Sequence, residues 1–116
     1  MKSSMVVSAN DSPATSPEAG LRRQVLAFSP SMMLVRHVMR KGWVGARHSH
    51  PHEQLVYVIR GKLRFVCGEE TFEAATGTSF IVPGGIEHQA VALEDSEVID
   101  VFAPYREDYV AGAHEQ

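Results

Sequence analysis

Three histidines stand close together in the chain, at His48, His50 and His52. His48 and His50 are separated by one residue, so an extended backbone projects both imidazoles from the same face. A metal ion that takes two nitrogen ligands from one segment needs this arrangement. A lone histidine is usually structural, but packing does not explain this pair, and we predict that both bind a metal. His52 follows Pro51, which bends the chain, so we expect its side chain to leave the site.

Two residues outside this pair could complete the ligand set. Gln54 has the parity of His48 and His50 and could place an amide oxygen on the same ion, although it could also be an ordinary strand residue. His88 is the best further candidate, because it opens an alternating segment directly after the Pro-Gly-Gly turn at residues 83–85. Glycines let such a turn approach another segment closely. We predict a site of three imidazoles and one amide.

The other histidines and the cysteine are assigned no chemistry. His37 stands in a long, largely apolar segment with no partner nearby in the sequence, and we interpret it as structural. His114 lies in a polar tail. Cys67 has no histidine near it in the sequence, so we interpret it as a small core residue and not as a nucleophile.

An acid in an apolar segment marks a second group of candidates. Asp100 shares a face with Val98 and Phe102, and burying a carboxylate without a partner costs free energy. If this face looks into a barrel, Asp100 could be a general acid or base near the metal. Otherwise it is an acid at a barrel mouth, bonded to backbone or to an arginine. Arg106 could hold a substrate carboxylate in fork geometry, or form a surface ion pair with one of the acids that follow it.

Aromatic residues could line the mouth of such a pocket. Trp43, Tyr105 and Tyr109 offer flat apolar surfaces on which a ligand could stack. We take Trp43 and Tyr105 as candidate substrate-binding residues. Aromatic side chains at the rim of a barrel are as often simple packing, so this alternative stays open.

Short strands must position these residues, because apolar segments alternate with turn residues along most of the chain. This pattern predicts an all-β sandwich or barrel of about eight strands. A turn or two of helix is expected over residues 105–110. The expected strands span residues 24–28, 32–40, 55–59, 63–67, 71–75, 78–82, 87–93 and 97–103.

The chain of 116 residues suffices for one core but not for two. We expect the barrel over residues 21–110 and a polar tail over 111–116. Residues 1–20 are rich in Ser, Pro and Ala, which is typical of a flexible leader or of one that docks on a partner. Residues 55–59 are apolar at both parities, so their outer face needs cover from a second sheet or another subunit. The second option predicts a homodimer.

Composition excludes several classes of function. The net charge of −3 and the absence of a long basic run argue against a nucleic-acid partner. No segment approaches the roughly 20 apolar residues of a membrane helix, and no apolar core of a secretory signal is present. The single cysteine suggests a reducing compartment, so we expect a cytoplasmic protein.

The spacing of these residues resembles the two motifs of the cupins, G-x5-H-x-H-x3,4-E-x6-G and G-x5-P-x-G-x2-H-x3-N. The first motif falls on Gly42, His48, His50, Gln54 and Gly61. The second falls on Gly77, Pro83, Gly85 and His88. Gln54 replaces the usual glutamate, and Ala92 the usual asparagine. The resemblance implies a single-domain cupin (a jelly-roll barrel, or double-stranded β-helix) with a metal site.

The exchange of glutamate for Gln54 changes the charge of that site. Three neutral imidazoles and a neutral amide leave a divalent ion with its full charge, which favours an anionic substrate. Such a nitrogen-rich set suits Zn, Ni, Co or Fe(II), with Mn also kept open, better than Mg or Ca. The sequence predicts one divalent transition metal without deciding which.

A narrower resemblance is to the small cupins of pectin and alginate breakdown, which convert unsaturated uronates from the cyclic to the linear keto form. It implies that Gln54 is a metal ligand and that Asp100, Phe102 and Arg106 belong to the active site. Our first hypothesis is a metal-dependent enzyme for a small anionic, sugar-like substrate. The alternatives are an Fe(II) dioxygenase-type cupin and a non-catalytic module that binds a metal or a small molecule.

Overall fold

Short strands with turns between them make up most of the structure, a computed structural model that describes residues 5–114 and the side chains of residues 5–110. In chain order the elements are η1 (Ala9–Asp11), β1 (Ala14–Glu18), β2 (Leu21–Ser29), β3 (Met32–Met39), β4 (Glu53–Arg60), β5 (Lys62–Cys67), β6 (Glu70–Ala75), β7 (Ser79–Val82), β8 (His88–Ala92), β9 (Ser96–Ala103) and α1 (Glu107–His114).

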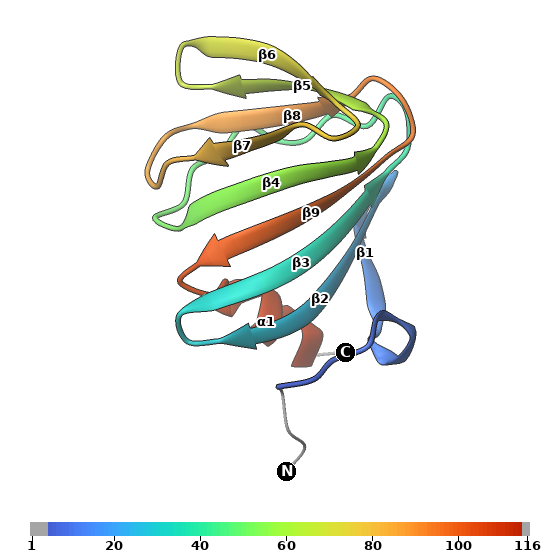
Figure 1. Cartoon of the computed structure of the whole chain (residues 1–116), viewed down its shortest axis with the longest axis vertical. Coiled ribbons are helices and arrows are strands. Elements are labelled where there is room, and N and C mark those ends of the chain that lie inside the picture. Colours follow the sequence, from blue (N-terminus) through green and yellow to red (C-terminus); the bar gives the residue numbers. More distant parts are fainter. Residues whose placement is uncertain (1–4, 115–116) are drawn as a thin grey trace.

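The strands form two antiparallel sheets (Figure 1). The larger sheet has the order β1-β2-β3-β9-β4-β7, and the smaller one has the order β6-β5-β8. The last strand, β9, lies in the larger sheet between β3 and β4, so it brings residues from three distant parts of the sequence side by side. This architecture confirms the all-β, jelly-roll prediction.

The inner faces of the two sheets enclose the core. On β4 the alternation is strict, with Val56 and Val58 buried while Leu55, Tyr57 and Ile59 remain 40–46% exposed. The main core cluster draws residues from both sheets. A second cluster of buried residues, which packs against Tyr109 and Val110 of α1, lies at the other end of the larger sheet and contains Met33, Val35 and Phe102.

Each of the eight expected strands overlaps a strand of the structure. The additional strand is β1, which comes from the segment expected as a leader and pairs with the outer edge of β2. Gln24 of β2 ties the preceding turn to this edge, because its side-chain amide donates to the carbonyls of Ala9 and Ser12. Helix α1 begins two residues later than expected and runs further, to His114.

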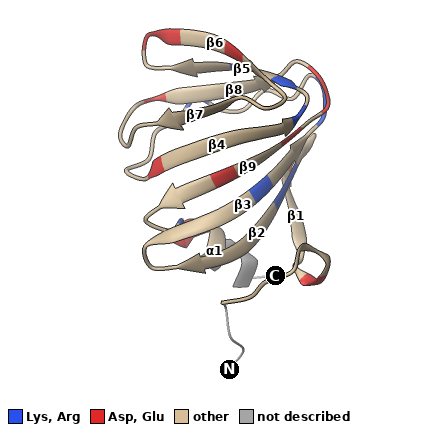
Figure 2. Cartoon of the chain, viewed as in Figure 1, with Lys and Arg blue, Asp and Glu red and all other residues tan. Residues whose placement is uncertain are grey.

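Many charged residues lie at strand ends and turns, and β3 and β9 also carry charge near their middle (Figure 2). Arg36 of β3 and Glu97 of β9 form an ion pair at 2.6 Å, and Arg60 of β4 lies 3.3 Å from the same carboxylate. The three strands are thereby joined on one face as well as through their backbones. Within residues 5–114, no helix has the length and apolar character needed to cross a membrane.

Candidate metal centre and cavity

The loop between β3 and β4 lies against the beginning of β8. His48 and His88 exchange both backbone hydrogen bonds, with N···O distances of 3.0 and 2.8 Å. This short antiparallel pairing sets the two side chains next to each other, and their ring centroids are 4.4 Å apart. The position of one histidine therefore fixes the position of the other.

The Pro-Gly-Gly turn holds the other end of this loop. The backbone N–H of Gly85 donates to the carbonyl of His50 at 2.7 Å. Gly84 passes so close to the carbonyl of Pro51 that a Cβ atom at this position would collide with it. The close approach predicted for these glycines is confirmed, and it sets where His50 enters the site.

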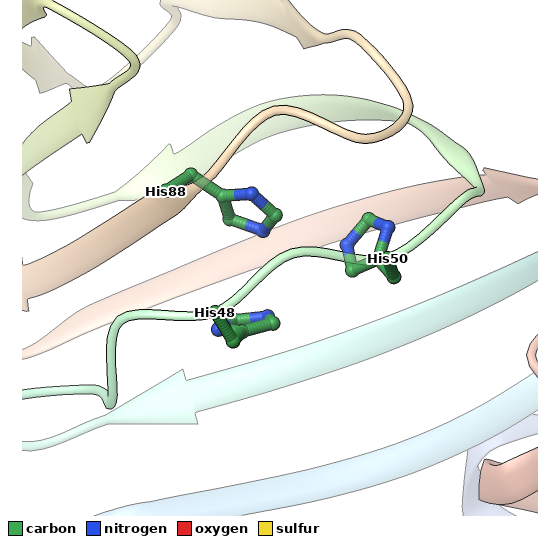
Figure 3. Close-up of side chains that lie close together, drawn as sticks. All are labelled: His48, His50 and His88. Carbon is green, nitrogen blue, oxygen red and sulfur yellow. The ribbon is translucent and has the colours of Figure 1, made fainter.

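Three imidazole rings converge from the loop and from β8 (Figure 3). One nitrogen from each of His48, His50 and His88 lies within 4.8 Å of the other two. The Nδ1 atom of each ring lies 2.9–3.0 Å from a backbone carbonyl only two residues away, at Ala46, His52 and Ile86 respectively. Since a carbonyl only accepts, each Nδ1 carries the proton and each Nε2 keeps a free lone pair. This is the tautomer that a metal ligand requires.

Gln54 adds an oxygen to these nitrogens. Its side-chain N–H donates to Oδ1 of Asp100 at 2.9 Å, so its Oε1 points the other way and lies 3.1 Å from Nε2 of His50. Because the Nδ1 atom of His50 carries the proton, two lone pairs face each other across this gap. A cation between them would satisfy both atoms. The donor set therefore fits a divalent metal.

The two buried histidines of this group resist protonation. Burial lowers the pKa of His50 to about 4, and the positive charge of Arg106 acts in the same direction. Burial also lowers the pKa of His88. Neutral imidazoles are the ligand form of histidine, so these two rings are ready to bind a cation at neutral pH without losing a proton.

Asp100 lies beside the histidines and is deeply buried. Its side chain is 4% exposed and has two polar partners: Gln54 on Oδ1, and Nδ1 of His37 at 2.6 Å from Oδ2. His37 in turn accepts a hydrogen bond from Nε of Arg23 at 3.1 Å. Asp100 therefore faces the interior of the barrel, and it is satisfied by side chains and not by backbone.

Most of these groups line one cavity of about 380 Å³, and His50 lies beside it without being one of its lining residues. Of the residues predicted for the site, the cavity lining includes His48, Gln54, His88, Asp100, Phe102, Arg106 and Trp43. Trp43 is held by a hydrogen bond from its indole N–H to Glu18 of β1 at 2.7 Å. Part of the segment expected as a leader therefore contributes to the wall of the cavity.

Arg106 forms the ion pair considered for it and also lies at the cavity. It is buried and lines the cavity, and it also makes two hydrogen bonds of 2.9–3.0 Å to Asp108. The guanidinium lies over the rings of Tyr109 and Phe102, at 4.2 and 5.1 Å from their centroids. The Arg106 hydrogen bond holds the pKa of Asp108 below its usual value. The arginine is thus fixed at the cavity wall by an acid and two aromatic rings.

Two residues occupy other places. Tyr105 does not line the cavity, and its ring stacks on Phe28 at 5.6 Å in the second core cluster. His52 lies outside the group of converging nitrogens, with its ring centroid 5.4 Å from that of His50. Its Nδ1 atom is buried, and it has no hydrogen-bond partner in the described part of the chain.

Sequence reasoning missed the contributions of His37 and Arg23 to the cavity. Their distance from Asp100 in the sequence hides the contact, since β2, β3 and β9 become neighbours only in the folded sheet. A signal was nevertheless present. His37 shares its parity with Val35 and Met39, and a polar side chain on a buried strand face needs a partner, by the same reasoning that singled out Asp100.

Comparisons with known proteins agree with this geometry. Residues 35–102 match the family described as "Cupin domain". "Pectin degradation protein KdgF" of Dickeya dadantii (strain 3937) is 32% identical over 93 residues, which cover 78% of this chain and 84% of that protein. The structure of KdgF from Halomonas sp. is 34% identical with a TM-score of 0.84, covering 90% of this chain and 98% of that one. An RmlC-like cupin from Shewanella frigidimarina NCIMB 400 is 31% identical with a TM-score of 0.86, covering 90% and 95%.

The chain therefore belongs to the cupin family. Within that family it is a small cupin related to the KdgF proteins. As in cupins generally, the fold places a group of histidines where it could hold a divalent metal. The resemblance drawn from the two sequence motifs is confirmed.

Proposed function

We propose that this protein is a metal-dependent enzyme that opens the ring of an unsaturated uronate, or of a similar anionic sugar, to give the linear keto form. The observation that carries the proposal is the buried Asp100, which lines the same cavity as His48 and His88 and is linked to His50 through Gln54. The relatedness to proteins named for pectin degradation supports the choice of substrate.

The roles follow from the chemistry of the reaction. Ring opening breaks the bond between the ring oxygen and the anomeric carbon, and the anomeric hydroxyl loses a proton as it becomes an aldehyde. The enol left behind takes up a proton on carbon and becomes a ketone, so no atom is gained or lost. One acid–base group within reach of both positions is sufficient, and Asp100 would be that group.

The other residues would hold the substrate and the metal. His48, His50, His88 and Gln54 would hold one divalent transition metal (Zn, Ni, Co, Fe or Mn), which would supply Lewis acidity when bound. Arg106 would bind the carboxylate of the substrate with the guanidinium N–H groups that Asp108 leaves unused. Phe102 and Trp43 would supply apolar contacts to the sugar ring.

The test is turnover of an unsaturated uronate by protein loaded with each metal in turn, with the keto product followed by NMR. We expect turnover with at least one metal and a loss of about 10²–10⁴-fold in kcat for Asp100→Asn, the range typical of a general acid or base. Metal binding should be weakened but still measurable, because His48, His50 and His88 keep their backbone partners. No turnover with any metal would overturn the proposal.

The same preparation separates the two alternatives. Oxygen uptake on phenolic or diketone substrates by the Fe(II)-loaded protein, without conversion of uronates, would identify a dioxygenase. Tight binding of uronates without conversion would identify a binding module.

We also propose a homodimer built on the outer face of the larger sheet, in the cytoplasm. Leu55, Tyr57, Ile59 and, on the neighbouring strand, Ile81 are 40–50% exposed there, and apolar side chains grouped in this way favour an interface. Light scattering after size-exclusion chromatography should give twice the chain mass. Leu55→Asp should give a monomer, and a wild-type monomer would contradict the proposal.

A further inference from the structure

A polar line crosses the inner face of the larger sheet, which is otherwise apolar. It runs diagonally through Arg23 of β2, His37 of β3, Asp100 of β9 and Gln54 of β4. Arg23 lies directly opposite His37 in the register. His37 pairs with Val98, two residues before Asp100, and Asp100 pairs with Val56, two residues after Gln54. Such diagonal neighbours on one face are within reach of each other's side chains.

The donor and the acceptor of each hydrogen bond in this line can be assigned, because the guanidinium of Arg23 only donates and the carboxylate of Asp100 only accepts. Arginine only donates, so Nε2 of His37 must accept from Arg23. The remaining ring proton of His37 is then on Nδ1, which donates to Oδ2 of Asp100. An ionised carboxylate only accepts, so the NH₂ group of Gln54 must point at Oδ1 of Asp100. The amide oxygen of Gln54 is left facing His50.

We propose that His37 and Arg23 are positioning residues that hold Asp100 in place and, through it, present the oxygen of Gln54 to the metal. This inference deepens the proposed function, since it rests on Gln54 as a ligand and on Asp100 as the acid–base group. A free amide turns its oxygen or its nitrogen toward a cation with little steric difference, and only the oxygen is a good ligand. The line of hydrogen bonds removes this choice.

Burial makes the line rigid. The side chains of His37 and Asp100 are 12% and 4% exposed, so water offers them few alternative partners. Arg23 is held from a second direction, because its guanidinium lies 3.8 Å from the ring centroid of Tyr109. The ring of His37 also meets Tyr109 edge-on at 6.3 Å. Helix α1 thus supports the line through the ring of Tyr109.

The first experiment compares His37→Asn with His37→Leu, two replacements of similar size of which only asparagine donates a hydrogen bond to Asp100. For His37→Leu we expect the affinity for Zn²⁺ or Ni²⁺, measured by calorimetric titration, to fall about tenfold. This is the lower end of the range for direct partners of metal ligands, because His37 acts on Gln54 only through Asp100. We also expect kcat to fall while KM changes little. His37→Asn should restore most of both quantities.

Equal metal affinities for the two variants would overturn the inference, because a purely structural histidine would be replaced equally well or equally badly by either side chain. Thermal unfolding of the metal-free variants provides the control for folding. A large difference in affinity between variants of similar stability cannot come from loss of the fold. Metal affinity does not require an active enzyme, so this result stands even if the protein proves inactive on uronates.

A second experiment uses the metal-free protein. Nitrogen-15 NMR of the imidazole rings should show His37 protonated on Nδ1 alone, and Arg23→Met should add a signal from a second tautomer or from the doubly protonated ring. Protonation on Nε2 in the wild type, or spectra of His37 unchanged by Arg23→Met, would overturn the role of Arg23. This measurement depends on neither metal nor substrate.

Discussion

The candidate site around the cavity has two walls that are built in different ways. The histidine wall consists of His48, His50 and His88, and each ring is oriented by a carbonyl only two residues away in the chain. The acid wall is the line of Arg23, His37, Asp100 and Gln54, in which every bond joins different strands. One wall is organised by local backbone and the other by the assembly of a sheet.

This difference has consequences for what each wall tolerates. A ring fixed by its own backbone keeps its tautomer and orientation as long as the loop keeps its shape. A side chain in the acid wall depends on the side chains next to it in the line, so the loss of one leaves a buried polar atom without a partner. We expect the histidine wall to fail one ligand at a time, and the acid wall to fail as a unit.

The largest effect should come from the loss of a direct metal ligand. We expect His88→Ala to lower the affinity for Zn²⁺ or Ni²⁺ by more than the 10–100-fold typical of outer partners, because a direct ligand is lost. Calorimetric titration measures this affinity. His52→Ala, which changes a neighbouring histidine outside the converging group, is the matched control and should stay near wild type. Equal losses in the two variants would show that His88 is no more a metal ligand than His52, and would remove the histidine wall as a metal site.

The second prediction places a charge where the two walls meet. Gln54→Glu removes the donor to Asp100 and sets two buried carboxylates side by side, so we expect the metal-free protein to lose about 3 kcal/mol of stability at pH 7. The repulsion raises a carboxyl pKa in the folded state. The variant is therefore relatively most stable at acidic pH, and it loses stability as the pH rises through that raised pKa.

Thermal unfolding of wild type and Gln54→Glu between pH 4 and 8 measures this effect. A divalent metal between the two carboxylates should offset the loss, so the stabilisation by metal should be larger in the variant than in wild type. A variant whose stability does not change with pH relative to wild type would show that the acid wall relaxes around a second charge.

The third prediction tests the local organisation of the histidine wall. Gly84→Ala places a Cβ against the carbonyl of Pro51, so we expect about 2 kcal/mol of destabilisation and a weaker metal site, because the loop that carries His50 must move. Gly68→Ala is the control, since its added Cβ meets only the side chain of Ile86 at 3.4 Å, at a glycine with φ of +60°. It should lose stability without losing metal affinity.

The smallest effect concerns the ion pairs that join the strands of the acid wall on one face. Hydrogen bonding from Arg36 lowers the pKa of Glu97 in the folded protein. Its contribution is therefore present above the pKa of an unfolded glutamate and disappears as the pH falls through the lowered value. We expect Glu97→Gln to cost about 1 kcal/mol at pH 7, with the difference from wild type vanishing in acid. Urea unfolding at several pH values checks this.

The strands could be predicted almost completely from the sequence, because alternation and turn residues act over short distances. Only β1 was missed, since residues 14–18 lack alternation and gain their structure from the free edge of β2. In the same way, nothing local showed that Glu18 would fix Trp43 at the cavity wall. Prediction from the sequence fails where the interaction joins residues that are far apart in the chain.

The candidate site divides in the same way, into a part that the local sequence indicates and a part that only the fold assembles. The spacing of His48 and His50 and the glycine turn before His88 indicated the histidine wall, and the orientation of each ring is set by its own backbone. The pairing of the His48 loop with β8 then brings the rings together. For the acid wall, the sequence showed only that Asp100 needs a partner. The fold decided which one, by inserting β9 between β3 and β4. His37 and Arg23 acquire their places in the site from that insertion, since residues far apart in the chain share a hydrogen bond only when strand order and register bring them together.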